Sequence, residues 1–549
     1  MTSADKIHNL STWDNVAPRT YTGRVICFPF DHVARKNQLE CAQTLMACLR
    51  SNLDVLVKER PDFAGKLQLG ANLTPNEKYK DGNVYLLTSS TSRIYLRPKY
   101  PKGLESIYGT VSARNGTENV KAKGIKFDEN FTDYDTLKRS KFPVKPFIHA
   151  DLTTDLMLEE GKPPIPVVEV EVIFLNGGFF FNLLIHHTYF DGKAYHKFLE
   201  CFAACTRGDK LPNYPTNPTV KLPYEQEQSL VEKKFEDILP LCSEFKTWPN
   251  NDLKGPTQPI QPDIPNSERP QSFKNDSKFF IFNFSKLKSL SLELAHLLPR
   301  GNKTTPPPSA YTTLCALLWA HTLVARESMV FNNNSCDPSE RAIHTHFSSH
   351  PPFFSTPVDW TSTKLLQKYP SLSPITAPYF GNTVTWAITT LPDKSLLHSI
   401  ASGNKESLAQ VASAISLSIS RVDPSFLYTR EALLNAVPDM RQLGLPWDSR
   451  MPAEWGMNSW ADFGADVEWS LPGVAKSPDL SKETLADAQR RVQKEVGGSG
   501  GLILPAKRAR SAEWECQVSL PEGAMRALEG DEVFKKYWEG VVGDEPVRK

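Results

Sequence analysis

The clearest pattern along the chain is a pair of apolar strands joined by a short turn. VVEVEVIFL and FFFNLLIHH flank Asn-Gly-Gly at 176–178, and two strand-like runs around such a turn predict a β-hairpin. Apolar positions then recur at helical spacing over 194–203 and stop at Gly208, which predicts a helix directly after the hairpin. The polar segment HHTYFDG, 186–192, therefore stands where a buried strand gives way to a helix.

The remaining pattern alternates helices and strands, which predicts a mixed α/β protein. Helices are expected at 36–58, 285–298 and 309–326, and strands at 84–90, 93–98, 278–284 and 513–520, with a closing helix after the last strand. Between 209 and 275 prolines are frequent and periodicity is weak, as in a connection between domains. A chain of 549 residues favours two domains, and we place them at 1–215 and 276–549, with a linker at 216–275.

Composition and charge exclude two classes of binding partner. Lys and Arg number 63 and Asp and Glu 62, and such a balance gives no basic surface for nucleic acid or anionic membranes. The nine cysteines include no C-x-x-C pair, no stretch reaches 18 apolar residues, and no apolar leader opens the sequence. We therefore expect reduced thiols, a cytoplasmic location, and neither a nucleic-acid nor a membrane partner.

His187 and Asp191 are the residues of chemical interest in HHTYFDG. A histidine at a strand exit can act as a general base, because neutral imidazole dominates near pH 7. Asp191 can orient the loop, and Gly192 allows a sharp turn. The alternative is structural: the histidines satisfy backbone groups and Asp191 caps the following helix. The spacing H-x-x-x-D alone favours that alternative.

Other segments favour the catalytic interpretation, because together with HHTYFDG they resemble the BAHD acyltransferases, particularly their fungal branch. The matching segments occur in family order over almost the whole chain. They are LSTWDNVAPRTY at 10–21, ERPDFAGKL at 59–67, IHHTYFDG with FLECFAACTRG, the apolar helix at 309–326, YFGNTV at 379–384, SW at 459–460, and EWECQVSLPEGAMRALEGDEVF near the end. HHxxxDG alone is shared with peptide-synthetase condensation domains, whereas the ordered set is more specific.

The resemblance implies two similar chloramphenicol-acetyltransferase-like α/β domains with a solvent channel between them. His187 would lie in the channel and deprotonate an acceptor hydroxyl, which attacks the thioester of acyl-CoA. It implies acyl-CoA, most often acetyl-CoA, as co-substrate, a hydroxylated secondary metabolite as acceptor, no bound cofactor or metal, and a monomer. Asp191 would hold the loop. An amide-forming condensation enzyme and a non-catalytic ligand-binding relative are the alternatives.

Two segments depart from the family pattern. The D-F-G-W-G signature is degraded, and both Asp462-Phe463-Gly464 and the stretch from Asp466 to Ser470 compete for it. We prefer the second, with Asp466 and Trp469 as its aspartate and tryptophan. In PVDWTSTKLL, 357–366, threonines occupy the positions where the family has arginines. Either Lys364 or another cation replaces them, or backbone donors alone hold Asp191.

Three other patterns carry weaker hypotheses. GGSGG at 497–501 has the G-x-S-x-G spacing, but an apolar run follows where a nucleophile elbow needs a helix. His344, His346 and His350 alternate as strand neighbours do, without a fourth metal ligand nearby. Candidates for the CoA phosphates, chosen only by charge, are Lys286, Lys288, Arg300 and Lys303.

Overall fold

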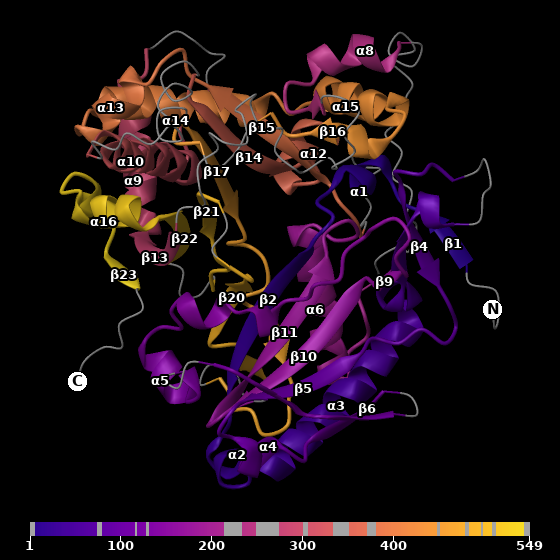
Figure 1. Cartoon of the computed structure of the whole chain (residues 1–549). Helices are drawn as coiled ribbons and strands as arrows, with labels where there is room; N and C mark the ends of the chain where they lie inside the picture. The colour runs from indigo at the N-terminus through magenta and orange to yellow at the C-terminus, as the bar shows by residue number, and fades with distance from the viewer. Residues whose placement is uncertain are drawn as a thin grey trace.

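Two mixed α/β halves make up the computed structural model. The structure describes residues 6–73, 79–115, 118–127, 131–212, 233–248, 274–299, 306–332, 351–370, 380–446, 451–477, 483–495, 498–507 and 512–542. Each half is built around one large sheet (Figure 1). Most of the proline-rich linker, with Arg300, Lys303 and the histidines at 344, 346 and 350, lies outside the described residues.

The sheet of the first half has six strands in the order β20-β2-β11-β10-β5-β8. The strands are β2 (Tyr21–Pro29), β5 (Leu96–Pro101), β8 (Lys123–Ile125), β10 (Val168–Leu175), β11 (Gly178–His186) and β20 (Ala488–Val492). The predicted hairpin is β10 and β11, paired antiparallel with Leu175 opposite Gly178. Gly177 closes its two-residue turn with a φ of +81°, a conformation that glycine adopts without a steric penalty.

One strand of this sheet comes from the other end of the chain. β20 pairs antiparallel with β2, so that Gly23 lies opposite Val492 and Cys27 opposite Ala488, and Figure 1 shows the two strands side by side. The two halves are therefore not separate on either side of the linker, because β20, which follows the linker in sequence, is the edge strand of the first sheet.

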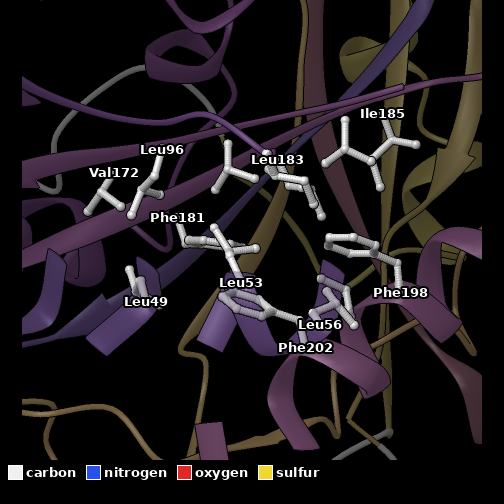
Figure 2. Close-up of a cluster of buried hydrophobic side chains, with 14 of the residues drawn as sticks. Leu49, Leu53, Leu56, Leu96, Val172, Phe181, Leu183, Ile185, Phe198 and Phe202 are labelled. Carbon is white, nitrogen blue, oxygen red and sulfur yellow. The ribbon is translucent and has the colours of Figure 1, made fainter. Parts of the chain in front are cut away.

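Helices α3 (Gln38–Glu59) and α6 (Gly192–Arg207) cover one face of this sheet. Their apolar side chains meet those of the strands in one core, shown in Figure 2, where leucines of α3 lie against phenylalanines of α6 and β11. α6 ends as predicted, since Gly208 is left-handed, with a φ of 73°, at its C-terminus. A smaller sheet, β1 (Lys6–Asn9), β4 (Val84–Thr88), β3 (Lys66–Leu69) and β9 (Ile165–Pro166), lies beside this core.

The second half has a seven-stranded sheet in the order β15-β14-β17-β21-β22-β13-β23. Its strands are β13 (Asn275–Asn283), β14 (Phe353–Asp359), β15 (Val384–Thr390), β17 (Glu454–Ser459), β21 (Gly500–Ile503), β22 (Glu513–Pro521) and β23 (Gly540–Val542). The apolar helix α10 (Ala310–Asn332) is central here, as its sequence predicts, because four helices contact it. They are α9 (Phe284–Leu297), α13 (Ser395–Ala401), α14 (Lys405–Ser420) and α16 (Glu522–Gly530).

Elements at the junction of the halves complete the architecture. α1 (Thr12–Val16) of the first half contacts α15 (Pro424–Ala436) of the second, and Trp13 and Trp360 meet there with ring centroids 5.7 Å apart. Among the described residues, no cysteine forms a disulfide and no helix has the length and hydrophobicity of a membrane span.

We predict that Leu53→Ala lowers the free energy of unfolding by about 2–5 kcal/mol, because the substitution leaves a cavity in the core of Figure 2. Leu53 is 3% exposed on α3, whereas Val55 on the same helix is 48% exposed. Val55→Ala is the matched control and should change stability little. Urea unfolding followed by circular dichroism compares them, and equal effects of the two substitutions would contradict the packing described.

Candidate functional site

His187 follows directly on the last residue of β11. Its backbone N–H donates to the carbonyl of Thr20 at 2.8 Å, and a turn at 187–189 leads to α6. Asp191 caps that helix, since its Oδ1 accepts from the N–H of Ala194 at 2.8 Å. The motif therefore joins strand to helix as predicted, and the capping role proposed for Asp191 is part of the structure.

The second oxygen of Asp191 is bound by the other half of the molecule. Oδ2 accepts from the backbone N–H of Thr383 at 2.8 Å and from the Thr383 hydroxyl at 3.0 Å. Asp191 is 2% exposed, and burial, with the nearby charge of Asp359, raises its pKa. Two backbone N–H groups and one hydroxyl thus hold this carboxylate, and neither an arginine nor Lys364, which is exposed on α12 (Thr363–Lys368), is the donor.

The residue before Thr383 forms a second connection between the halves. Asn382 donates its side-chain N–H to the backbone oxygens of His187 at 2.9 Å and Thr188 at 3.1 Å. Its own backbone N–H donates to Oδ1 of Asp14 at 2.7 Å. Asp14 is fully buried and belongs to a capping box with Ser11 at the start of α1. The turn carrying His187 is therefore fixed by a loop of the second half.

A lysine of the first half binds the segment in which the sequence has threonines in place of arginines. Lys193 Nζ lies 3.2 Å from Asp359 Oδ2, and it also donates to the hydroxyl of Thr361 at 2.8 Å. The Thr361 hydroxyl in turn donates to Oδ1 of Asp359 at 2.6 Å. Lys193 belongs to the first turn of α6, so it joins the two halves through Asp359, while Asp191 is held by backbone N–H groups and a hydroxyl.

These contacts surround a cavity of about 220 Å³ lined by both halves. The first half contributes His187, Trp13, Thr22, Arg24, Gly192 and Tyr195, and the second half Asn382, Thr385, Trp386, Asn458, Trp460 and Phe463. His187 is partly exposed, while His186 is fully buried. The structure thus gives the two adjacent histidines different surroundings and places only His187 on the cavity wall.

The surroundings of the two histidines keep both rings neutral. Burial lowers the pKa of His187, and the charge of Arg491 acts in the same direction, while the backbone oxygen of His187 and the carboxylate of Asp191 oppose it. Burial lowers the pKa of His186 to about 3, and its ring meets Tyr21 edge-on at 5.0 Å. His186 has the structural role that the sequence left open for both, and His187 is the available base.

Gly192 serves close packing rather than a sharp turn. It begins α6, and a Cβ there would lie 2.8 Å from Cε2 of Phe463. The turn itself is made by residues 187–189. A side chain at position 192 would therefore collide with the ring of Phe463 from the second half, and this contact, not a sharp turn, favours glycine there.

The segments that compete for the second signature lie in different places. Phe463 lines the cavity with His187, whereas Asp466 is exposed and lines a separate pocket that also contains Asp462. Trp469 is 2% exposed and packs against Phe181 and Phe202 in the first core. The structure therefore does not bring Asp466 together with His187 and Asp191.

The remaining predicted sites fall elsewhere. Lys286 pairs with Glu539 at 2.6 Å, and Lys288 is exposed on α9. After GGSGG the chain continues into β21, so no nucleophile elbow forms. The described residues contain no group of three His, Cys, Asp or Glu side chains placed to bind a metal ion.

Sequence reasoning gave no role to Asp14 or Asn382 and did not single out Arg24. Asp14 carries a local signal, since S-x-x-D is typical of a capping box. Its contact with Asn382 spans 368 positions, and no local pattern marks it.

Comparisons with known proteins bear on the fold and on the segment that contains His187. The model of the Transferase family matches residues 121–333, which include HHTYFDG. The fold matches F. graminearum TRI101 complexed with coenzyme A and deoxynivalenol, at a TM-score of 0.64 and 15% identity over 98% of this chain and 100% of that one. F. sporotrichioides TRI101 complexed with coenzyme A and T-2 matches at a TM-score of 0.62 and 17% identity, over the same shares of the two chains. No curated protein sequence matches significantly. The predicted fold of two similar α/β domains is confirmed.

We predict that Thr383→Val destabilises the protein by about 1–3 kcal/mol, because it removes a donor from the buried carboxylate of Asp191. The exposed Thr390 lies farther along the same segment, on β15, and Thr390→Val is the matched control for exchanging a hydroxyl for a methyl group. Thermal unfolding of the two variants is the measurement. Equal midpoints would show that the hydroxyl of Thr383 contributes nothing to holding Asp191.

Proposed function

We propose that this chain is a BAHD acyltransferase, which transfers an acyl group from acyl-CoA to a hydroxyl of a small molecule. The observation that carries the proposal is the cavity at the junction of the halves, with the partly exposed imidazole of His187 on its wall. A general base must reach the proton that it removes, and this ring is the histidine that lines the cavity among the described residues.

The reaction follows from one base. His187 takes the proton of the acceptor hydroxyl as its oxygen attacks the thioester carbonyl. A C–O bond forms, and the C–S bond breaks as the tetrahedral intermediate collapses. The imidazolium then returns the proton to the sulfur of the leaving CoA, so that the enzyme ends unchanged. No covalent bond to the protein is needed.

Asp191 and Asn382 take positioning roles in this scheme. Asp191 is bound by Ala194 and Thr383, so its oxygens hold the loop and are not free for substrate. Asn382 holds the backbone oxygen of His187, and it thereby orients the turn that carries the base. The roles of Asp466 and Trp469 in the second signature remain predictions.

Coenzyme A as co-substrate is supported by structures that share this fold and hold it together with a second small molecule. We infer acetyl-CoA as the donor and a hydroxylated secondary metabolite as the acceptor. Both halves of one chain line the cavity, which supports action as a monomer, and the free thiols of the described residues support a cytoplasmic location. Membership of the fungal branch stays a prediction.

We predict that His187→Ala lowers kcat by about 10²–10⁴-fold, because it removes the base. The assay follows free thiol from acetyl-CoA with a panel of hydroxylated metabolites. His32 is exposed at the start of α2 (His32–Lys36), and His32→Ala is the control that should retain wild-type turnover. Acceptor-dependent release that survives in His187→Ala would overturn the proposed base. Turnover only with a carrier-bound donor would indicate a condensation enzyme, and no turnover with any donor a binding protein.

We predict that the dependence of kcat/KM on pH reflects the lowered pKa of His187. The base acts only when neutral, so kcat/KM rises with pH through that pKa, below the ordinary value of 6.5, and is level above it. The measurement is kcat/KM between pH 5 and 8, with circular dichroism to show that the protein stays folded. His187→Ala should lack this limb in its residual rate. A midpoint at or above 6.5 in the wild type would contradict the described surroundings.

A further inference from the structure

Arg24 of β2 is a buried cation on the wall of the cavity that contains His187. It is 1% exposed, and its guanidinium lies between two rings, 4.2 Å from the centroid of Tyr195 and 4.4 Å from that of Trp460. Nη1 donates to the backbone oxygen of Phe463 at 2.8 Å. Nη1 of the guanidinium therefore has a hydrogen-bond acceptor, and aromatic rings pack against both faces of the group.

The other edge, formed by Nε and Nη2, has no hydrogen-bond partner among the described residues, although both atoms are buried. Elsewhere in this chain the same edge binds carboxylates in a two-point contact. Arg430 does so with Glu244 at 2.5 and 2.8 Å, and Arg60 with Asp62 at 3.0 and 2.6 Å. Arg24 presents this fork of donors, which matches a carboxylate in spacing and charge, without an acceptor.

No ion pair neutralises Arg24 in the part of the chain that the structure describes. Burial lowers its pKa to about 10, and the nearby Tyr195 opposes this shift. A buried charge without a counter-ion costs free energy. An anion bound at the free edge would recover that free energy, so the site is poised to bind one.

A second cation stands beside Arg24 on the same face of the sheet. Arg491 of β20 is the cross-strand partner of Arg24, and side chains of directly paired residues lie on one face. Arg491 is exposed, and it forms no ion pair with the described residues. Its charge reaches His187, where it helps to lower the pKa of the imidazole. Arg24 thus lines the cavity, and Arg491, which does not line it, adds positive charge from the same face of the sheet.

We propose that Arg24 and Arg491 form an anion subsite that binds a carboxylate of the substrate within reach of His187. The inference rests on the proposed function and names its substrate class: one of the two reactants, acceptor or acyl group, carries a carboxylate besides the reacting group. Arg24 supplies the two-point contact, and Arg491 adds charge at the open side of the strand pair.

The phosphates of CoA do not fit this subsite. Arg24 lines the same cavity of about 220 Å³ as His187, and the thioester must lie beside His187 for transfer to occur. The long pantetheine arm separates the phosphates from the thioester, so a thioester beside His187 places the phosphates away from the wall that His187 shares with Arg24. The bound anion therefore belongs to the acyl group or to the acceptor.

The test measures binding to His187→Ala, which removes the base, so that the result does not depend on turnover. In the donor arm, calorimetry compares malonyl-CoA and succinyl-CoA with acetyl-CoA. In the acceptor arm, it compares 3-hydroxybenzoate and cholate with their methyl esters. We expect the acid to bind about tenfold more tightly than its neutral counterpart in one arm, as for a charge-assisted two-point contact. The arm that shows the preference identifies which reactant carries the carboxylate.

Arg24→Lys and Arg491→Gln, each made in the His187→Ala protein, should reduce that preference several-fold. Arg491→Gln keeps the test decisive if Arg24→Lys fails to fold, because Arg491 is exposed on a strand edge. Arg93→Gln, at an exposed arginine outside the cavity, is the matched control for loss of one charge.

Three outcomes would overturn the proposal. Acid and neutral probes could bind equally in both arms, or the preference could survive both arginine substitutions. Weaker binding of CoA itself to the arginine variants would assign the subsite to the phosphates. Acyl transfer between neutral substrates by the wild type would remain in each case, so the anion subsite can fail while the proposed function stands.

Discussion

Buried carboxylates at the junction of the halves constrain the rest of the site. Asp14 and Asp191 are both removed from water, and a buried carboxylate is stable only where donors replace its lost hydration. The loop that contains Asn382 and Thr383 supplies donors to both. Because two adjacent residues must satisfy two acids of the other half, the two halves can meet in few other ways.

This constraint explains why His187 has a defined position although it lies in a turn. Asn382 holds the peptide oxygen of His187 while its own backbone is held by Asp14. The same junction brings Phe463 against Gly192 and Trp460 against Arg24. The cavity wall that contains His187 and the candidate anion subsite are therefore products of one interface.

The elements that could be predicted from the sequence are those whose signals are local. The hairpin of β10 and β11, the helix ending at Gly208 and the apolar helix α10 each carry their periodicity and end signals within the segment. The donors of Asp191 could not be identified from the sequence, because Thr383 lies 192 positions away. In addition, nearly every residue has a backbone N–H, so the residue type does not reveal which N–H is the donor. For the same reason the sequence left open whether Lys364, another cation or backbone donors hold Asp191, and the structure shows two backbone donors and the hydroxyl of Thr383.

The edge strand β20 has a consequence for how the protein is made. Its pairing with β2 joins residues more than 450 positions apart, as for Arg24 and Arg491. On the ribosome β2 emerges long before β20, so this edge of β2 stays open until β20 has been synthesised. An unpaired edge is prone to pair with other chains, and such long-range closure slows folding. Newly made chains thus pass through a state in which this edge is open to pairing with other chains.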